Sequence, residues 1–304
     1  MNKWISAELL EEFQSAGTNS HRLFSSRDAW IERLGRDILI SHKTQESLEL
    51  CLSGLKDWPG KSLFQPDRIF ARFLPKQNAD RQSPVLLEGD AALSPETVVM
   101  ENGVRYGIDF TAGYAAGLFL DQRANRAFVR QLGIKGKKTL NTFAYTCSFS
   151  VVAAVAGAET LSLDLSKKSL DRGKGNFELN GLSLDGHRFI ADDVLDVLPR
   201  LDKRGEKFDL IILDPPTFSL GNRGRKWKVE DQMEDLIASA LELAAPGAWL
   251  LVSTNCTKID RFSLERMAKF ALKRARTHAT THHEPALPDF PQNEGAVTLW
   301  LKLH

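Results

Sequence analysis

Cysteine is scarce in this sequence, and neither sign of charge predominates. The 304 residues include three cysteines, Cys51, Cys147 and Cys256, and no two of them form a C-x-x-C pair. This pattern excludes a disulfide scaffold and a cysteine-rich zinc site, and it is typical of the reducing cytosol. Lys and Arg total 40 against 39 Asp and Glu, for a formal net charge of +1. Nucleic-acid binding therefore requires local basic patches, because the chain has no overall positive field.

Long apolar runs, internal repeats and low-complexity tracts are also missing. No apolar run reaches the roughly eighteen residues that would span a bilayer, and the first residues, Met1–Trp4, do not begin a signal-peptide core. With 42% hydrophobic and 26% charged residues, the composition is that of an ordinary globular protein. We expect a soluble, cytoplasmic protein with no membrane partner, and the length allows two domains or one large α/β unit.

The first 125 residues predict two stretches of different character. Residues 1–65 have no assignable role. Within them, a short amphipathic helix is expected over Ser6–Phe13. Residues 66–125 predict a small α+β module, because Arg68–Phe73 alternates basic and apolar residues as a half-buried strand does. In this module Asn102-Gly103 lies between two apolar runs and predicts a tight β-hairpin, since both residues tolerate positive φ.

Residues 126–304 alternate regularly between apolar strands and helical segments. The almost continuously apolar run Phe208–Asp214 is typical of a strand covered on both faces. Ser166 is placed to cap a helix that Asn180-Gly181 would end. Such alternation predicts an α/β fold with a doubly wound, mainly parallel, Rossmann-like sheet and right-handed crossovers. The expected strands are 139–144, 160–164, 187–191, 208–214, 248–253 and 296–303, and the expected helices are 148–158, 166–179, 229–243 and 263–276.

Doubly wound sheets bind ligands beyond the carboxyl ends of their strands, and four of the expected strands end in polar residues. The first is not followed by G-x-G-x-x-G, which argues against a dinucleotide. Asp164 ends the second strand, where a carboxylate can accept hydrogen bonds from both hydroxyls of a ribose. Asp192 and Asp193 end the third, where a carboxylate can accept one from an adenine amino group. Together they predict an adenosine ligand without phosphates, for which S-adenosylmethionine is the clearest candidate.

The fourth strand ends in the string Asp214-Pro215-Pro216-Thr217. Two consecutive prolines fix φ and remove two backbone donors, so the corner is rigid and its carbonyl groups are free to point into a site. A stiff turn after a buried strand would give the same string. Its position at the predicted ligand-binding edge favours a functional role.

Three strings resemble a known family. They are Gly117–Arg126 (G-L-F-L-D-Q-R-A-N-R), Asn141–Thr146 (N-T-F-A-Y-T) and Asp214–Ser219 (D-P-P-T-F-S). With Asp164 and Asp193, they look like the class I methyltransferases that modify bases of large-subunit ribosomal RNA, and they are most similar to the RlmI type (cytosine carbon-5) and the RlmK type (guanine nitrogen-7). The resemblance runs from about residue 68 to the end. It implies a class I methyltransferase domain over residues 126–304, after the small module, and S-adenosylmethionine as the methyl donor.

The resemblance also implies roles for individual residues. The implied residues of the cofactor pocket are Phe143 and Tyr145 around the methionine and ribose, Asp164 on the ribose, and Asp193 or its neighbour Asp192 on the adenine. The implied residues beside the methyl group and the target base are Asp214, Pro215 and Pro216, with Asp121, Gln122 and Arg123 bracing the methionine end of the cofactor.

The chain departs from the family in two places. The family commonly has Thr-Gly-Gly or Thr-Gly-Ser where this chain has Thr146-Cys147-Ser148, so the Cβ of Cys147 is expected to narrow the cofactor pocket. The separate N-terminal RNA-binding barrel of some members is not found here either, so the RNA substrate rests on fewer residues than the cofactor does.

Cys256 decides between two kinds of target atom. Methylation at carbon-5 of a pyrimidine requires a thiolate that adds to carbon-6. Related carbon-5 enzymes carry a cysteine in the loop after the fifth strand, but Asn255 occupies the aligned position here, and a buried structural thiol is the competing interpretation. A guanine nitrogen-7 needs only positioning. Thr217 in place of a lysine after D-P-P is more like the RlmK type, and the target atom stays open.

A basic segment directly after the corner offers a route for the phosphate backbone. We expect its Lys and Arg side chains to bind phosphates and the indole of its tryptophan to stack on a base. A solvated loop is the alternative. His282-His283-Glu284 lacks a third spaced ligand, so no metal site is expected. The predicted nucleic-acid residues are Arg223, Arg225, Lys226, Trp227 and Lys228.

The sequence thus predicts an S-adenosylmethionine-dependent methyltransferase that acts on a base of ribosomal RNA. The first alternative is a methyltransferase of a small molecule or a protein amine, because D-P-P corners also serve nitrogen nucleophiles. The second is a cofactor-binding or RNA-binding module without turnover, because Cys147 lies in the cofactor turn. Neither the oligomeric state nor the role of residues 1–65 can be predicted.

Overall fold

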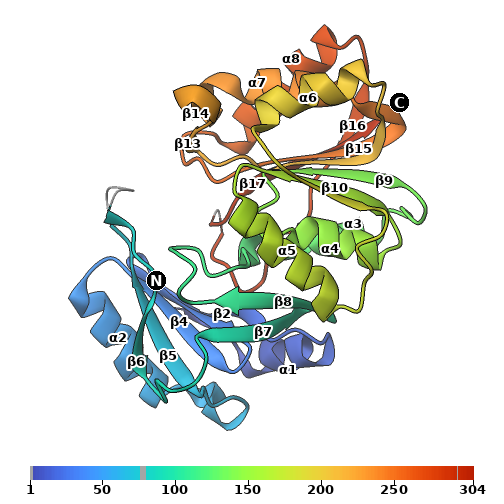
Figure 1. Cartoon of the computed structure of the whole chain (residues 1–304). Coiled ribbons are helices and arrows are strands. Elements are labelled where there is room, and N and C mark those ends of the chain that lie inside the picture. Colours follow the sequence, from blue (N-terminus) through green and yellow to red (C-terminus); the bar gives the residue numbers. More distant parts are fainter. Residues whose placement is uncertain (1–2, 76–79, 293) are drawn as a thin grey trace. The chain divides into compact units, whose positions relative to one another are not determined.

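The computed structural model describes residues 3–304 except 76–79 and 293, and it leaves out the side chains of Pro59 and Arg223. The chain divides into two compact units (Figure 1). Unit 1 comprises Met1–Arg123 and Ala286–Glu294, and unit 2 comprises Ala124–Pro285 and Gly295–His304.

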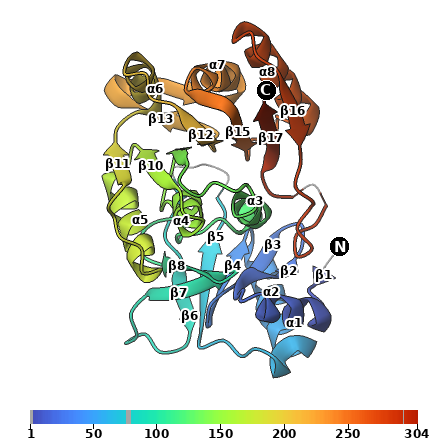
Figure 2. The same cartoon turned by 90° about the vertical axis from the view of Figure 1, so that its right-hand side faces the viewer.

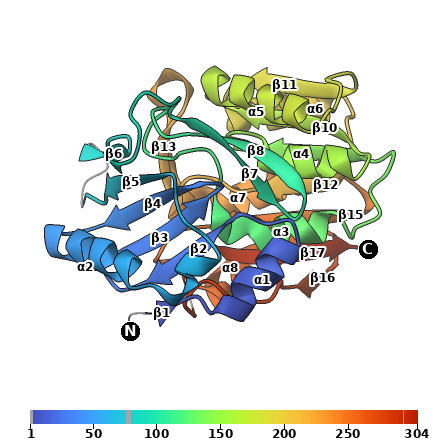
Figure 3. The ribbon, with the colours of Figure 1, turned by 90° about the horizontal axis from the view of Figure 1, so that it is seen from below.

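Unit 1 is built on a six-stranded sheet. Its elements are β1 (Lys3–Trp4), α1 (Ala7–Ser15), β2 (Ser20–Ser25), β3 (Ala29–Leu34), β4 (Asp37–His42), α2 (Gln45–Lys56), η1 (Pro59–Ser62), β5 (Arg68–Phe73), β6 (Val85–Glu88), β7 (Glu96–Glu101), β8 (Val104–Asp109) and η3 (Leu120–Gln122). The strand order is β1-β2-β3-β4-β5-β6, and Figure 3 shows β2 to β5 side by side. All neighbours are antiparallel except β4 and β5, which are parallel with α2 between them in the chain. The sheet therefore continues across residue 65, where the sequence suggested a boundary.

Two local predictions for unit 1 are confirmed. The N-terminal helix begins after Ser6, whose hydroxyl accepts a hydrogen bond from the N–H of Leu9 (3.3 Å). The hairpin β7–β8 turns at Asn102 (φ 51°) and Gly103 (φ 78°), the two residues expected to tolerate positive φ. The side chain of Asn19 accepts from the N–H of Met100 (2.6 Å), which holds the hairpin beside the start of β2.

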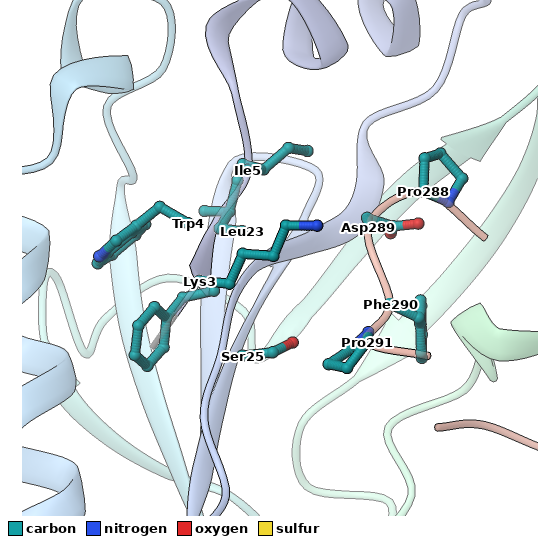
Figure 4. A pocket seen from close by; sticks show the side chains of 10 residues that line it. Lys3, Trp4, Ile5, Leu23, Ser25, Pro288, Asp289, Phe290 and Pro291 are labelled. Atoms are coloured by element: carbon teal, nitrogen blue, oxygen red, sulfur yellow. The ribbon is translucent and has the colours of Figure 1, made fainter. Parts of the chain in front are cut away.

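The segment Ala286–Glu294 belongs to unit 1 although it lies near the end of the chain. The carboxylate of Asp289 accepts a hydrogen bond from the backbone N–H of Arg22 (2.9 Å) and pairs with the guanidinium of Arg123. The guanidinium of Arg22 lies 4.0 Å from the ring centroid of Phe290. Figure 4 shows a small pocket between this segment and β1 and β2, and no residue of the predicted site lines it. Its labelled lining includes Lys3, Trp4, Ile5, Leu23, Ser25, Pro288 and Pro291.

His21 on β2 is expected to make unit 1 sensitive to acid. Its ring is fully buried against Phe13, and burial lowers the pKa of His21 to about 3. The folded state therefore keeps the imidazole neutral, while the unfolded chain takes up a proton below its usual pKa of about 6.5. The contribution of the buried, neutral His21 to the free energy of unfolding is therefore complete above pH 6.5. It falls progressively as the pH drops toward 3, with about 2 kcal/mol lost at pH 5.

The variant His21→Gln tests this, because its neutral amide can still donate to the backbone carbonyl of Arg22, which lies 3.2 Å from Nδ1 of His21. In urea titrations at pH 7 and pH 5, the wild type should lose about 2 kcal/mol more than the variant between the two pH values. The same change at the exposed His278 is the matched control and should leave the wild-type difference unaltered. Equal losses in the wild type and His21→Gln would contradict the assignment.

Unit 2 contains the predicted doubly wound sheet. Its elements are α3 (Arg123–Val129), β9 (Lys138–Thr142), α4 (Ser148–Val155), β10 (Glu159–Asp164), α5 (Lys167–Leu179), β11 (His187–Ala191), α6 (Val194–Lys203), β12 (Phe208–Leu213), β13 (Phe218–Leu220), η4 (Asn222–Gly224), β14 (Lys226–Lys228), α7 (Val229–Leu241), β15 (Ala244–Thr254), α8 (Arg261–Arg274), β16 (Ala279–His282) and β17 (Val297–Leu303). The order is β11-β10-β9-β12-β15-β17-β16, parallel from β11 to β15, with β17 antiparallel to both of its neighbours.

Helices cover both faces of this sheet. Figures 1 and 2 show α3, α4 and α5 on one face and α6, α7 and α8 on the other. The second face holds a large apolar core, in which Leu198, Ile237 and Leu264 from the three helices form one cluster with buried side chains of the strands. This architecture confirms the fold class predicted from the sequence. Among the residues that the structure describes, no helix has the length and apolarity needed to cross a bilayer.

Candidate functional site

The turn between β9 and α4 has an unusual backbone. Phe143, Tyr145 and Cys147 all have positive φ (53°, 47° and 60°). Left-handed backbone costs a residue with a Cβ about 1 kcal/mol or more, so glycine usually fills such positions. This chain therefore builds a tight turn at the end of its first parallel strand without a single glycine.

Neighbouring elements hold the turn in place. The N–H of Ala144 donates to the carbonyl of Leu163 (3.0 Å), and the side-chain amide of Asn176 on α5 donates to the carbonyl of Thr146 (2.8 Å). Below the turn, buried side chains connect β9 to α4 and β10 through the hydroxyl of Ser150, which lies 2.9 Å from Asn141 Nδ2 and 2.7 Å from Ser162 Oγ. Because three elements fix it, the strained backbone is preorganised.

The side chain of Cys147 is directed at α5. It is fully buried, and its Sγ and Cβ occupy the space that a Cβ at Gly173 would need, the Cβ position lying only 2.9 Å away. Burial raises the pKa of the Cys147 thiol to about 12, so the thiol is a packing group. The extra Cβ in the turn is thus matched by a missing Cβ on the neighbouring helix.

Asp164 lies at the carboxyl end of β10 and is half-buried. Its Oδ2 accepts from the N–H of Tyr145 and its Oδ1 from the N–H of Ser166, both at 2.8 Å. Burial raises the pKa of Asp164, and the two backbone hydrogen bonds oppose that shift. Each oxygen has a second lone pair, so the carboxylate can still accept hydrogen bonds from a diol.

Asp192 and Asp193 follow β11. Asp193 caps α6, with Oδ1 accepting from the N–H of Leu195 (3.0 Å) and Oδ2 from the N–H of Asn222 (3.0 Å). Asp192 pairs with Arg200 and accepts from the side-chain amide of Asn222 (2.8 Å), and the hydrogen bond from Arg200 is the main cause that lowers the pKa of Asp192. The segment after β13 therefore lies directly on the end of β11.

The Asp214-Pro215-Pro216-Thr217 corner connects to two other segments. The carbonyl of Pro216 accepts a hydrogen bond from the indole Nε1 of Trp227 (2.8 Å). The hydroxyl of Thr217 donates to Oδ1 of Asn255, in the loop after β15, at 2.8 Å. Both Thr217 and Asn255 are exposed, so a hydroxyl and an amide lie side by side at the mouth of the corner.

Two side chains of the basic segment do not have the surroundings expected for binding RNA. Trp227 is only 3% exposed and lies over the corner, 5.9 Å from the ring of Phe143, so its indole cannot stack on a base in this structure. Arg225 is paired with Asp196 at the start of α6 (2.7 Å), so an acidic side chain already occupies its guanidinium. Lys226 and Lys228 are exposed, and the side chain of Arg223 lies outside the described residues.

Cys256 is also buried, with 4% exposure. Its Sγ lies 3.5 Å from Oε1 of Glu230 on α7, and Glu230 in turn pairs with Lys258 (3.0 Å). All three cysteines of the chain are free and buried. None of them is presented to solvent as a nucleophile.

The remaining predicted residues, Asp121, Gln122 and Arg123, belong to unit 1. Gln122 and Arg123 are buried, and Arg123 lies over the ring of Phe13, 4.6 Å from its centroid, in addition to its pairing with Asp289. These contacts fix the end of unit 1. Their expected role toward the cofactor is untested and stays a prediction.

Four residues of this region had no individual role assigned from the sequence: Gly173, Asn222, Phe218 and Leu220. The two apolar ones were detectable, because Phe218-Ser219-Leu220 and Lys226-Trp227-Lys228 alternate with period two around a glycine-containing turn. Gly173 and Asn222 act through partners far away in the chain, which no local pattern reveals.

The chain has relatives among proteins named for ribosomal RNA methylation. It is 34% identical over 91% of its length to YwbD of Bacillus subtilis (strain 168), whose name proposes a ribosomal RNA large subunit methyltransferase. It is 32% identical over 74% of its length to ribosomal RNA large subunit methyltransferase I of Aeromonas salmonicida (strain A449), and 33% identical over 81% to methyltransferase K/L of Shewanella frigidimarina (strain NCIMB 400). It spans 71%, 56% and 33% of the lengths of these three proteins.

Solved structures share the fold. SMU.776 complexed with SAH superposes with a TM-score of 0.81 at 22% identity, over 99% of this chain and 83% of that one. A SAM-dependent methyltransferase from Agrobacterium tumefaciens gives 0.71 at 23% identity, over 94% of this chain and 90% of that one. The family model of S-adenosylmethionine-dependent methyltransferases matches residues 77–303, well over half of the chain. The chain therefore belongs to the family of S-adenosylmethionine-dependent methyltransferases, as its motifs indicated, and S-adenosylmethionine is its cofactor.

Proposed function

We propose that this enzyme methylates a base of large-subunit ribosomal RNA. The observation that carries the proposal is the match of this chain, over 91%, 81% and 74% of its length, to relatives whose names specify that class of substrate. The exposed hydroxyl and amide at the corner are suited to hold a base, and exposed lysines follow nearby. The cytoplasm is the proposed location, in keeping with such a substrate.

The carboxyl edge of the sheet fits the cofactor. Asp164, with its free lone pairs, would hold the ribose hydroxyls, and the preorganised turn with Phe143 and Tyr145 would surround the ribose and the methionine part. Asp193 or Asp192 would accept from the adenine amino group, with Asn222 as a second contact of the same carboxylates. Asp121, Gln122 and Arg123 would support the methionine end. When bound, the cofactor supplies an electrophilic methyl group on a sulfonium.

The chain's own contribution to the reaction is positioning. The corner Asp214, Pro215, Pro216 has no N–H on its two prolines, and Trp227 fixes the carbonyl of Pro216. A rigid edge that offers acceptors can bind an amino or ring N–H of a base and so hold the nucleophilic nitrogen of that base in line with the methyl group. Such orientation supplies most of the rate of a displacement that needs no other covalent step.

A ring nitrogen is the target atom that the geometry favours. Carbon-5 of a pyrimidine needs a thiolate at carbon-6, and Cys51, Cys147 and Cys256 are all buried. The resemblance aligns Asn255 with the cysteine of carbon-5 enzymes, and the side-chain oxygen of Asn255 accepts a hydrogen bond from Thr217 (2.8 Å). We therefore place guanine nitrogen-7 ahead of cytosine carbon-5.

The variant Cys256→Ser separates the two targets. Methyl transfer to unmodified large-subunit ribosomal RNA should stay within about threefold of the wild type, since no covalent adduct forms at a ring nitrogen. Transfer is measured with S-adenosylmethionine labelled in the methyl group, and Cys51→Ser is the matched control on α2 of unit 1. A loss of about 1000-fold, with S-adenosylhomocysteine binding intact, would establish a carbon-5 target instead.

The same assay tests the substrate class. Label should enter ribosomal RNA and should not enter small-molecule amines or protein. Methylation of an amine alone would contradict the proposal and favour the first alternative. Cofactor binding without transfer to any RNA would favour a binding module.

A further inference from the structure

The hairpin β13–β14 carries an exposed face on which two of the lysines predicted to bind RNA lie beside two apolar side chains that have no assigned role. The register pairs Phe218 with Lys228, Ser219 with Trp227, and Leu220 with Lys226. Since side chains alternate along a strand, Phe218, Leu220, Lys226 and Lys228 share one face, and Trp227 lies on the other. Phe218 is 46% and Leu220 57% exposed, whereas Trp227 is buried. We call these four side chains the hairpin face.

The hairpin is held firmly at its base. The indole of Trp227 donates to the carbonyl of Pro216 (2.8 Å), and the N–H of Val229 donates to the carbonyl of Thr217 (3.1 Å). Both bonds tie the hairpin to the Asp-Pro-Pro corner. The hairpin face is therefore presented in a fixed position beside the residues proposed to hold the target base.

The tip of the hairpin is held as well. Asn222 donates from its backbone to Asp193 and from its side chain to Asp192, and a Cβ at Gly221 would collide with the carboxylate of Asp193. Figure 1 shows the hairpin at one end of the sheet of unit 2. A platform fixed at both ends loses little conformational entropy when it binds a ligand.

The charges of the segment are divided unequally. Arg225 forms an ion pair with Asp196 of α6. In the described part of the chain, neither Lys226 nor Lys228 forms an ion pair within 4.0 Å, and both residues are exposed. Of the cations of the segment whose side chains the structure describes, the two without such an ion pair thus lie on the hairpin face, next to an aromatic and an aliphatic side chain.

We propose that the hairpin face binds an unpaired RNA segment that flanks the target base. The ring of Phe218 stacks on a neighbouring base, Leu220 contacts the next nucleotide, and Lys226 and Lys228 bind phosphates. Exposed rings between cations are the usual means of holding single-stranded nucleic acid, and a base must leave its stack to reach the residues of the corner. This inference rests on the proposed function, and it transfers to Phe218 the stacking role that the sequence suggested for Trp227.

Binding of a single-stranded RNA oligonucleotide of about twelve nucleotides tests the proposal. Fluorescence anisotropy at several salt concentrations is expected to show that Phe218→Ala raises Kd about tenfold. The pair Lys226→Gln and Lys228→Gln should reduce the slope of log Kd against log salt by about 1.4, since each single-strand phosphate contact contributes roughly 0.7. S-adenosylhomocysteine binding should not change in either variant.

Matched controls come from α8, which also exposes an aromatic ring and lysines. Phe270→Ala removes a ring that is 52% exposed, and the pair Lys269→Gln and Lys273→Gln removes the same charge. If these changes weaken RNA binding as much as the hairpin changes do, the effect is nonspecific and the proposal is overturned. If the wild type methylates ribosomal RNA but the hairpin variants bind the oligonucleotide as tightly as the wild type does, this proposal alone is overturned. A wild type that neither binds the oligonucleotide nor methylates ribosomal RNA would overturn the proposed function too.

Discussion

Asp164→Ala is expected to weaken the binding of S-adenosylhomocysteine about 100-fold or more. The carboxylate ends β10 with one lone pair of each oxygen occupied by a backbone N–H and the other available to a ribose hydroxyl. Two hydrogen bonds to a charged acceptor contribute about 1.5–3 kcal/mol each, and about 1.4 kcal/mol corresponds to a tenfold change in Kd. The change also removes the acceptor of Tyr145 N–H and so loosens the turn. Titration calorimetry of the wild type and the variant measures the effect.

A second variant keeps this test informative if the alanine change disturbs folding. Asp164→Asn preserves volume and one acceptor oxygen, so it should fold and still bind at least about tenfold more weakly than the wild type. Asp171→Asn is the matched control, because this carboxylate is exposed on α5 and, among the described residues, forms its ion pair with Lys174 (2.8 Å). Binding by Asp164→Ala within about threefold of the wild type would remove Asp164 from the cofactor site.

The sheet of unit 2 was predictable because its signals are local. The run Phe208–Leu213 is nearly all apolar and becomes the buried central strand β12, with neighbours on both sides. Ser166 caps α5, as its position before a helical pattern predicted, by accepting from the N–H of Ser169 (3.2 Å). The order of carboxylates along the chain then placed Asp164 and Asp193 at one edge of the sheet, because parallel strands end at the same side.

Unit 1 was much less predictable. All six residues of β2, Ser20–Ser25, are buried although four of them are polar, so the strand shows no alternation. The ring of His21 packs on Phe13, and Arg22 contacts Asp289 and Phe290, so both residues are buried. Asp289 lies 267 residues further along the chain than Arg22. A sequence pattern reports the neighbours of a residue only when they are close in the chain.

Within the site, the sequence identified residue types better than their surroundings. It placed an aromatic ring and cations beside the corner, but it could not tell that Trp227 turns inward to the carbonyl of Pro216 while Phe218 stays exposed. The left-handed turn was also hidden, because Phe143, Tyr145 and Cys147 are not residue types that announce positive φ. Hydrogen bonds from elsewhere in the fold impose both features.

Gly173→Ala is expected to destabilise unit 2 by about 3 kcal/mol, the upper end of what overpacking costs. Replacing glycine with alanine inside a helix usually stabilises a protein by up to about 1 kcal/mol, so the sign is the opposite of the ordinary one. The new Cβ would meet the Sγ of Cys147 and lie 2.9 Å from its Cβ. Displacing Cys147 would also disturb the turn, so S-adenosylhomocysteine should bind more weakly. Urea unfolding and calorimetry measure the two effects.

The same helix provides the control. Gly175 has open space where a Cβ would be added, so Gly175→Ala should stabilise unit 2 by up to about 1 kcal/mol and leave cofactor binding unchanged. Combining Gly173→Ala with Cys147→Gly should restore most of the lost stability, because the second change removes the collision and relieves a left-handed residue. Equal stability of the two single alanine variants would show that Cys147 does not fill this space. A coupling of about 3 kcal/mol in the double-mutant cycle would instead show that the chain tolerates a cysteine in its cofactor turn because α5 carries a glycine opposite it.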